Sequence, residues 1–292
     1  MLCVTGMETT AQQWRARVTR SVELLRATMH ELRLDAMHDA RAALTSLGQL
    51  PANTVVCCRP VRQGGQSLAT DAARLAMLKM ALAQGARWID VEADLDAALL
   101  DSLPRERVIL SWHDYRHGDA ASIRSALTRA KGRTAAYKIA ISVSDASQLH
   151  ALLDVAPSAA SAAAPTAVLL AMGPAGLLSR MRYHHFGSAW TYVAASDTQA
   201  TAPGQLSLAS AHALGVLRRC RVPLLALLGG PQVMHSPGPR VYGRLLANYQ
   251  YLPVVTGQLH RSLSLLRRLG GVGASVTMPL KQCALRVASV TP

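Results

Sequence analysis

The chain has 292 residues, half of them hydrophobic, and a formal net charge of +14 at pH 7. This composition excludes a disordered protein and predicts one large domain with at most a small second one. No uncharged apolar run reaches about 18 residues, and no basic region precedes an apolar one at the N-terminus, so we expect no membrane span, no signal peptide and a cytoplasmic location.

Short segments rich in β-forming residues recur along the first two thirds of the chain. There are eight of them, at residues 2–6, 29–35, 53–60, 87–94, 107–114, 136–142, 166–173 and 190–195. Segments with helical spacing of apolar residues lie between them. Strands that alternate with helices favour parallel pairing, so the pattern predicts an α/β (β/α)8 TIM barrel. A doubly wound open sheet is the alternative.

Charged and ionisable residues fall within the predicted strands rather than only between them. Because burial makes an unpaired charge costly, and because such barrels carry their chemistry at the C-terminal ends of the strands, we expect these side chains to face one another across the barrel mouth. They are Glu31, Arg33, Arg59, Asp90, Glu92, His113, Asp114 and Lys138.

Lys138 stands in the apolar segment AYKIAIS, although the chain has only four lysines among its thirty-one basic residues. A desolvated lysine amine can form an imine with a ketone, and the imine then acts as an electron sink. His113, at the end of the preceding strand, is the candidate base, and Glu92 is the candidate residue for orienting it. Arginines at the rim would hold an anionic substrate.

These segments resemble, in order, the motifs of type I 3-dehydroquinate dehydratases over residues 1 to about 215. The matching segments are ELRLD (31–35), CRPVRQGG (58–65), IDVEAD (89–94), SWHD (111–114), YKIA (137–140), MGPAGLLSR (172–180), FGSAWTY (186–192) and TAPGQ (201–205). The resemblance implies dehydration of 3-dehydroquinate to 3-dehydroshikimate, a step of the shikimate pathway, without metal or organic cofactor. It also suggests a homodimer.

The resemblance assigns a role to each site residue. Lys138 makes the Schiff base, His113 acts as base and then as acid, and Glu92 orients His113. The substrate-binding residues are Glu31, Arg33, Arg59, Arg180 for the carboxylate, and Thr201 and Gln205 on a lid-like loop. Two positions depart from the family pattern: Gln63 replaces a Glu, and Thr201 replaces a more common Ser.

A second pattern begins near residue 220, so we predict a barrel domain at 1–219 and a small incomplete α/β lobe at 220–292. Residues 227–254 and 271–285 resemble the substrate-binding half of shikimate dehydrogenase. Ser236 and Lys281 would be site residues there, but Gly238 and Gly243 replace an expected Ser and Asn. No nicotinamide-binding unit follows, so we expect no hydride transfer unless a separate chain or segment supplies the cofactor domain.

The remaining composition argues against other partners and sites. The five cysteines form no C-x-x-C pair and lack histidines at ligand spacing, which predicts reduced thiols and no metal. Arginines spread singly, with few aromatic residues, predict a basic surface that attracts small anions rather than nucleic acid. Two alternatives to the dehydratase stay open: another imine-forming barrel such as an aldolase, and a catalytically weak binding or regulatory protein for quinate-type or shikimate-type acids.

Overall fold

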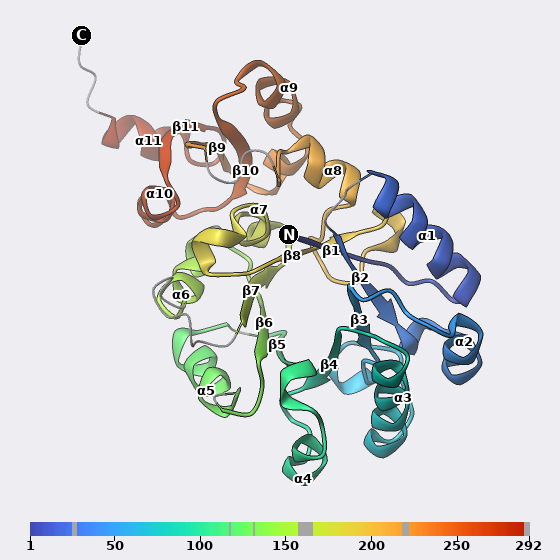
Figure 1. Ribbon diagram of the computed structural model, residues 1–292. Helices are drawn as coiled ribbons and strands as arrows, with labels where there is room; N and C mark the ends of the chain where they lie inside the picture. The colour runs from blue at the N-terminus through green and yellow to red at the C-terminus, as the bar shows by residue number, and fades with distance from the viewer. Residues whose placement is uncertain (25–27, 117, 131, 157–165, 218–221, 289–292) are drawn as a thin grey trace.

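The structure is a computed structural model that describes residues 1–24, 28–116, 118–130, 132–156, 166–217 and 222–288 (Figure 1). Eight parallel strands in the described chain form one sheet in the order β7-β6-β5-β4-β3-β2-β1-β8. They are β1 (Leu2–Thr5), β2 (Thr28–Arg33), β3 (Thr54–Cys57), β4 (Trp88–Glu92), β5 (Val108–Asp114), β6 (Ala136–Ser142), β7 (Thr166–Met172) and β8 (Thr191–Ala194). This sequential order confirms the predicted barrel and contradicts the doubly wound alternative, in which the order would reverse.

The two strands at the ends of this order, β7 and β8, are joined by the residues that precede β8. The Ala189 amide donates to the Ala167 carbonyl at 2.9 Å. The Ser188 hydroxyl accepts from the Leu169 amide at 2.8 Å and donates to the Leu169 carbonyl at 3.0 Å. The side of the barrel between β7 and β8 is therefore bridged by hydrogen bonds.

Helices surround the barrel (Figure 1). The buried apolar side chains form two layers, one inside the ring of strands and one between the strands and the helices. The helices are α1 (Ala11–Leu24), α2 (Ala40–Leu47), α3 (Asp71–Ala83), α4 (Ala97–Asp101), α5 (Ala120–Ala130), α6 (His150–Leu153), α7 (Leu177–Met181) and α8 (Leu208–Ala213). In β6, Ala136 and Ala140 belong to the inner layer, whereas Ile139 and Ile141 belong to the outer one. The alternation of side chains along a strand thus turns Lys138 into the barrel.

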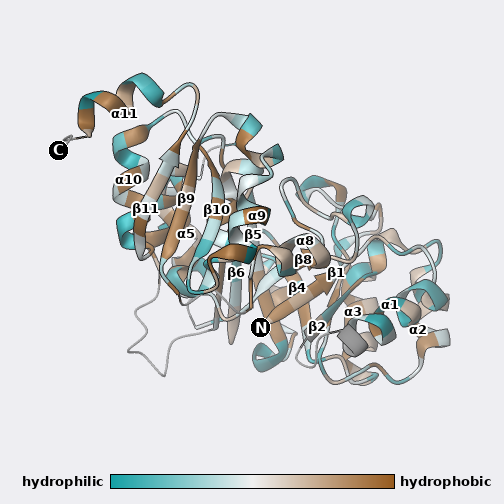
Figure 2. Cartoon of the chain, turned by 90° about the horizontal axis from the view of Figure 1, so that it is seen from above, coloured by the Kyte–Doolittle hydropathy of each residue, from teal (hydrophilic) through white to brown (hydrophobic). Residues whose placement is uncertain are grey.

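A small lobe follows the barrel and lies beyond α7 and α8 in Figure 1. Its parallel sheet has the order β10-β9-β11. Its elements are β9 (Leu224–Gly229), α9 (Gly238–Leu245), β10 (Gln250–Val255), α10 (Leu259–Arg268), β11 (Gly271–Val276) and α11 (Lys281–Val287). The strands are largely apolar in both sheets (Figure 2), but β11 and α11 contain no buried residue. In the lobe sheet, β10 on one edge of β9 is therefore buried, whereas β11 on the other edge is largely exposed.

Arg182, just after α7 of the barrel, holds the lobe in place. Its side chain is 1% exposed, and it donates to the carbonyls of Val222 and Leu269, each at 2.7 Å. On the same side, the Asp145 carboxylate accepts from the Thr256 hydroxyl at 3.0 Å and from the Gly257 amide at 2.7 Å. Polar groups of the lobe thus find their hydrogen-bond partners on side chains of the barrel.

Some predictions fall at the edge of what the structure describes. The predicted domain boundary between residues 219 and 220 lies outside the described residues, as does Cys220. The four described cysteines, Cys3, Cys57, Cys58 and Cys283, are free thiols. In the described parts of the chain, every helix is too short or too polar to cross a lipid bilayer.

Candidate active site

A pocket of about 60 Å³ opens at the C-terminal ends of the barrel strands. Eight of the nine site residues predicted in the barrel line it: Glu31, Arg33, Arg59, His113, Lys138, Arg180, Thr201 and Gln205. Glu92, the ninth, is fully buried and is not among the lining residues. The sequential strand order brings residues more than 150 positions apart into this one pocket.

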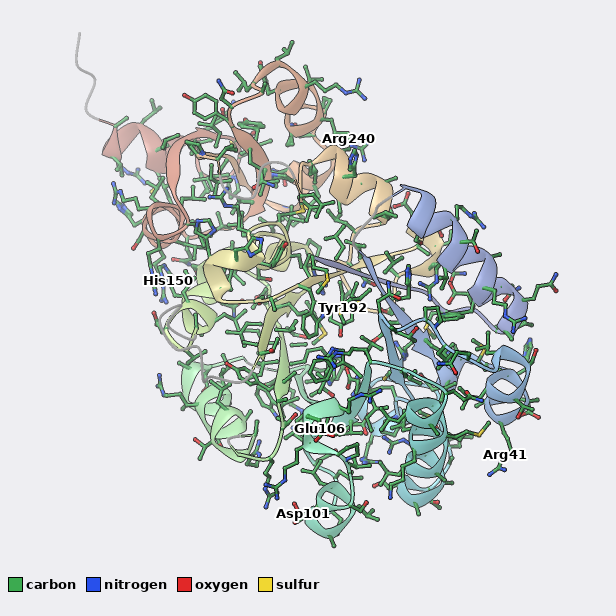
Figure 3. All side chains as sticks on the ribbon, in the orientation of Figure 1. Arg41, Asp101, Glu106, His150, Tyr192 and Arg240 are labelled. Carbon is green, nitrogen blue, oxygen red and sulfur yellow. The ribbon has the colours of Figure 1, made fainter. Side chains whose placement is uncertain are left out.

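Lys138 is 6% exposed, and its amine points into the barrel. The amine donates a hydrogen bond to the carboxylate of Asp90 on β4. It also lies 5.0 Å from the ring centre of Tyr192, which sits near the middle of the barrel in Figure 3. A charged partner and an aromatic wall therefore fix the position of the amine.

Asp90 is the centre of a buried ion-pair network below the pocket. Besides Lys138, it accepts from Arg59 at 2.7 Å. Burial alone would raise the pKa of Asp90, but the charges of Arg59 and Lys138 hold that pKa below its usual range. Asp90 is thus ionised at neutral pH and balances two cations.

The predicted contact between Glu92 and His113 is wrong. One oxygen of the Glu92 carboxylate accepts from Arg59 at 2.9 Å, and the other accepts from Arg74 on α3. The Nδ1 atom of His113 has no hydrogen-bond partner among the described residues. The reason is local: two buried guanidinium groups take the carboxylate, so Glu92 positions Arg59 instead of the imidazole.

His113 lies near the C-terminal end of β5 and is half-buried beside Lys138 in the pocket. Burial, together with the charges of Arg59 and Lys138, lowers the pKa of His113 well below its ordinary value of 6.5. The imidazole is therefore neutral at pH 7, which is the form that can accept a proton.

Of the three arginines in the pocket, Arg180 differs in its partners. Arg33 makes two bonds to Asp35, at 2.9 and 2.7 Å, and Arg59 is held by Asp90 and Glu92. Arg180 is 3% exposed and donates its Nε to the carbonyl of Ala171 at 3.2 Å. Its Nη2 atom has no partner in the described chain, and burial lowers its pKa to about 10. A buried cation without a counter-ion fits an anionic ligand.

Thr201 and Gln205 close one side of the pocket. The Gln205 side-chain oxygen accepts from the Thr201 amide at 2.7 Å and from its hydroxyl at 3.1 Å. Gly204, with φ +70°, packs so closely on Gly173 that an added Cβ would lie 2.3 Å from the Gly173 carbonyl oxygen. The loop is therefore folded onto the end of β7.

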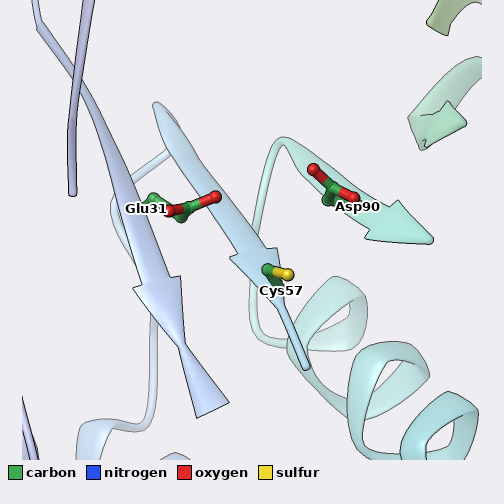
Figure 4. Close-up of side chains that lie close together, drawn as sticks. All are labelled: Glu31, Cys57 and Asp90. Atoms are coloured by element: carbon green, nitrogen blue, oxygen red, sulfur yellow. The ribbon is translucent and has the colours of Figure 1, made fainter. Parts of the chain in front are cut away.

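Glu31, Cys57 and Asp90 form a compact group inside the barrel, with possible metal-ligand atoms within 4.8 Å of one another (Figure 4). Thr5 donates to Glu31, and Asp90 is held by its two cations. Burial raises the pKa of the Cys57 thiol well above its ordinary value, so it stays protonated. We therefore assign this group to the ion-pair network rather than to a metal site.

The two site residues predicted in the lobe, Ser236 and Lys281, do not line the same hollow. Ser236 lines a hollow of about 640 Å³ with His235, Arg240 and Arg244, and its hydroxyl accepts from the Gly238 amide at 3.2 Å. Lys281 is exposed at the start of α11 and does not line this hollow.

Sequence reasoning placed Asp90 at the barrel mouth without a role in the chemistry, and it did not single out Tyr115 or Tyr192. Asp90 lies two positions before Glu92 on the same face of β4, and Tyr115 lies two positions after His113. Tyr192 follows the inward-facing Trp190 by two on β8. The two-residue period of strands is the signal for Asp90 and Tyr192, whereas Tyr115 lies beyond the end of β5 and is not covered by that period.

Comparisons with known proteins place this site in a family. Residues 2–218 match the sequence model of type I 3-dehydroquinase. A 3-dehydroquinate dehydratase from Syntrophobacter fumaroxidans is 31% identical over 197 residues, which cover 63% of this chain and 83% of the relative. A type I 3-dehydroquinate dehydratase structure from Clostridium difficile has a TM-score of 0.61 and 21% identity, and the match covers 72% of this chain and 88% of that one.

Bifunctional proteins match the lobe as well. The chloroplastic bifunctional 3-dehydroquinate dehydratase/shikimate dehydrogenase of Arabidopsis thaliana is 27% identical over 284 residues, covering 92% of this chain and 46% of the relative. A dehydroquinate dehydratase and shikimate dehydrogenase structure from S. pombe has a TM-score of 0.61 and 18% identity, covering 98% of this chain and 58% of that one. This chain spans about half the length of these bifunctional relatives. On the family match over residues 2–218, the chain belongs to the type I 3-dehydroquinase family.

Proposed function

We propose that this protein is a hydro-lyase that dehydrates 3-dehydroquinate to 3-dehydroshikimate, with Lys138 as the imine-forming residue. The observation that carries the proposal is the meeting of Lys138, His113 and Arg180 in one pocket. A nucleophilic amine, a neutral base and a cation that has no counter-ion among the described residues match a ketone, an acidic C–H bond and a carboxylate on one substrate.

In the first step, the Lys138 amine gives up a proton and attacks the substrate ketone, and water leaves as the imine forms. Neutral His113 is the pocket base that can accept this proton, and it returns the proton to the carbinolamine hydroxyl, which leaves as water, so the imidazole is neutral again for the second step. Arg180 holds the carboxylate, so the ring is fixed between the two ends of the pocket.

In the second step, His113 removes a proton from the carbon next to the imine, and the electron pair moves into the imine to give an enamine. The pair then returns, the neighbouring hydroxyl leaves, and the imidazolium protonates it so that water departs. Hydrolysis of the conjugated imine releases 3-dehydroshikimate and restores the Lys138 amine. Within this scheme Asp90 and Arg59 position the lysine from below.

The test is the ultraviolet absorbance of the conjugated enone when purified protein meets 3-dehydroquinate, run beside Lys138→Ala. Absorbance that rises with the parent only supports the imine dehydratase. A parent protein that binds 3-dehydroquinate without turnover supports the binding or regulatory alternative. Turnover of an aldol substrate in place of 3-dehydroquinate supports the aldolase alternative.

The remaining assignments belong to the same proposal. The lobe lacks dehydrogenase activity, because Ser236 and Lys281 do not share its hollow and Gly238 and Gly243 supply no side chain to bind a substrate. Shikimate with a nicotinamide cofactor should give no hydride transfer. A homodimer, a cytoplasmic location and no nucleic-acid partner complete the proposal, and light scattering at several concentrations tests the dimer.

A further inference from the structure

One hydrogen bond crosses the mouth of the pocket, and the sequence did not predict it. The Tyr115 hydroxyl donates to the backbone carbonyl of Gln63 at 2.9 Å. Tyr115 follows β5 and Gln63 follows β3, so the bond passes over the end of β4, which lies between them in the sheet. Both residues line the pocket.

The backbone at Gly64 is suited to this contact. Gly64 has φ +74°, and an added Cβ would lie 2.4 Å from the Tyr115 hydroxyl oxygen. Glycine is thus needed both for the left-handed conformation and for the close approach.

The segment that carries Gln63 has its own anchors on the outer side. Arg62 binds Asp71 through two hydrogen bonds of 3.1 Å, and the Gln63 side-chain amide donates to Asp94 at 2.9 Å. The segment is thus already fixed on its outer side. The hydrogen bond from Tyr115 fixes it on the side that faces His113.

The ring of Tyr115 also contacts His113. The two ring centres are 6.2 Å apart with an interplanar angle of 15°, which is an offset stack. Since His113 Nδ1 has no hydrogen-bond partner in the described chain, ring packing rather than a hydrogen bond restrains the imidazole on that side.

We propose that Tyr115 is a positioning residue for the dehydration: its hydroxyl fastens the Gln63 segment across the pocket mouth, and its ring holds the His113 imidazole. The inference rests on the proposed function. The two tasks belong to different atoms of one side chain, so two substitutions separate them.

Tyr115→Phe removes the hydroxyl and keeps the ring. We expect KM for 3-dehydroquinate to rise by about 2- to 10-fold, the effect of one lost hydrogen bond, with kcat and its pH profile unchanged. Tyr115→Leu removes both, and we expect kcat to fall by about 10- to 100-fold because the base is misplaced. Tyr249→Phe, which changes a partly exposed tyrosine of the lobe, is the matched control and should behave as the parent.

The pH profile separates positioning from a merely structural role. In Tyr115→Leu, water gains access to His113, so its pKa rises toward 6.5 and the acid limb of kcat/KM moves to higher pH. In Tyr115→Phe the limb should stay in place. Thermal unfolding of both variants establishes that they are folded.

Gly64→Ala provides an independent approach to the same bond, because the added Cβ pushes the hydroxyl away. In the double variant that carries both Gly64→Ala and Tyr115→Phe, the rise in KM should be smaller than the sum of the rises in the two single variants. A folded Tyr115→Phe with parental KM, or an additive double variant, overturns the role of the hydroxyl. A Tyr115→Leu variant with parental kcat and acid limb overturns the role of the ring. A parent without dehydratase activity overturns the proposed function and this inference together.

Discussion

The amine of Lys138 in β6 donates a hydrogen bond to the carboxylate of Asp90 in β4, although β5 lies between the two strands. Arg59 holds the other oxygen of the same carboxylate at 2.7 Å. One buried carboxylate thus fixes two cations beneath the pocket. It contributes both to the stability of the barrel and to the position of the Lys138 amine.

Reduction with borohydride should trap the imine on Lys138. With 3-dehydroquinate present, we expect a covalent adduct by mass spectrometry and irreversible loss of activity in the parent, and no adduct in Lys138→Ala. Activity of that variant should fall by about 10⁴-fold or more, the scale for a nucleophile that works with its base. Lys79→Ala, a change to a lysine on α3, should form the adduct as the parent does. An adduct on Lys138→Ala would mean that another amine reacts.

Asp90→Asn should destabilise the barrel strongly. Two buried cations would lose their shared counter-charge, which costs about 3–5 kcal/mol of unfolding free energy. Denaturant unfolding followed by circular dichroism measures the change. Asp154→Asn removes the partner of Arg268 in an exposed pair and should cost less than about 1 kcal/mol. Equal effects in the two variants would contradict the role assigned to the buried network.

The activity should persist below the ordinary pKa of histidine. Because the pKa of His113 lies well below 6.5 and the neutral form is the base, the acid limb of kcat/KM should fall below pH 6.5. The same shift stabilises the fold above pH 6.5, and that contribution is lost as the pH falls toward the folded-state pKa. A pH profile of the parent measures the limb, and an acid limb at or above 6.5 is the contrary result.

Arg180→Met should weaken substrate binding more than it slows turnover. The carboxylate would lose its charged partner in a buried site, so we expect KM to rise by about 30-fold or more. Steady-state kinetics with 3-dehydroquinate provides the measurement, and Arg41→Met on the exposed face of α2 is the control. An unchanged KM would place the carboxylate elsewhere in the pocket.

The barrel was predictable because its strands carry two signals at once: apolar residues and inward charges at a two-residue period. Strand ends were less certain. The third strand was predicted to reach residue 60 but ends at Cys57, because the backbone then turns at Pro60 into the segment that carries Gln63. Local turn chemistry sets such ends, and strand propensity does not contain it.

The site was predictable as a set of residues but not as a set of contacts. Eight predicted residues share the pocket, yet Glu92 binds Arg59 and Arg74 instead of His113. Arg74 lies on α3, and nothing in its helical segment indicates that it reaches a strand carboxylate. Pairing among buried charges depends on three-dimensional distances, which strand periodicity cannot supply.

Arg182 belongs by sequence to the barrel, but the carbonyl groups it satisfies belong to Val222 and Leu269. Removing the lobe from the barrel would expose to water the guanidinium of Arg182, which is buried in the intact protein. It would also leave the carbonyl groups of Val222 and Leu269 without this donor. The two modules are consequently not interchangeable parts: any attempt to transplant this barrel, or to graft another lobe onto it, has to redesign residue 182 as well as the joining segment.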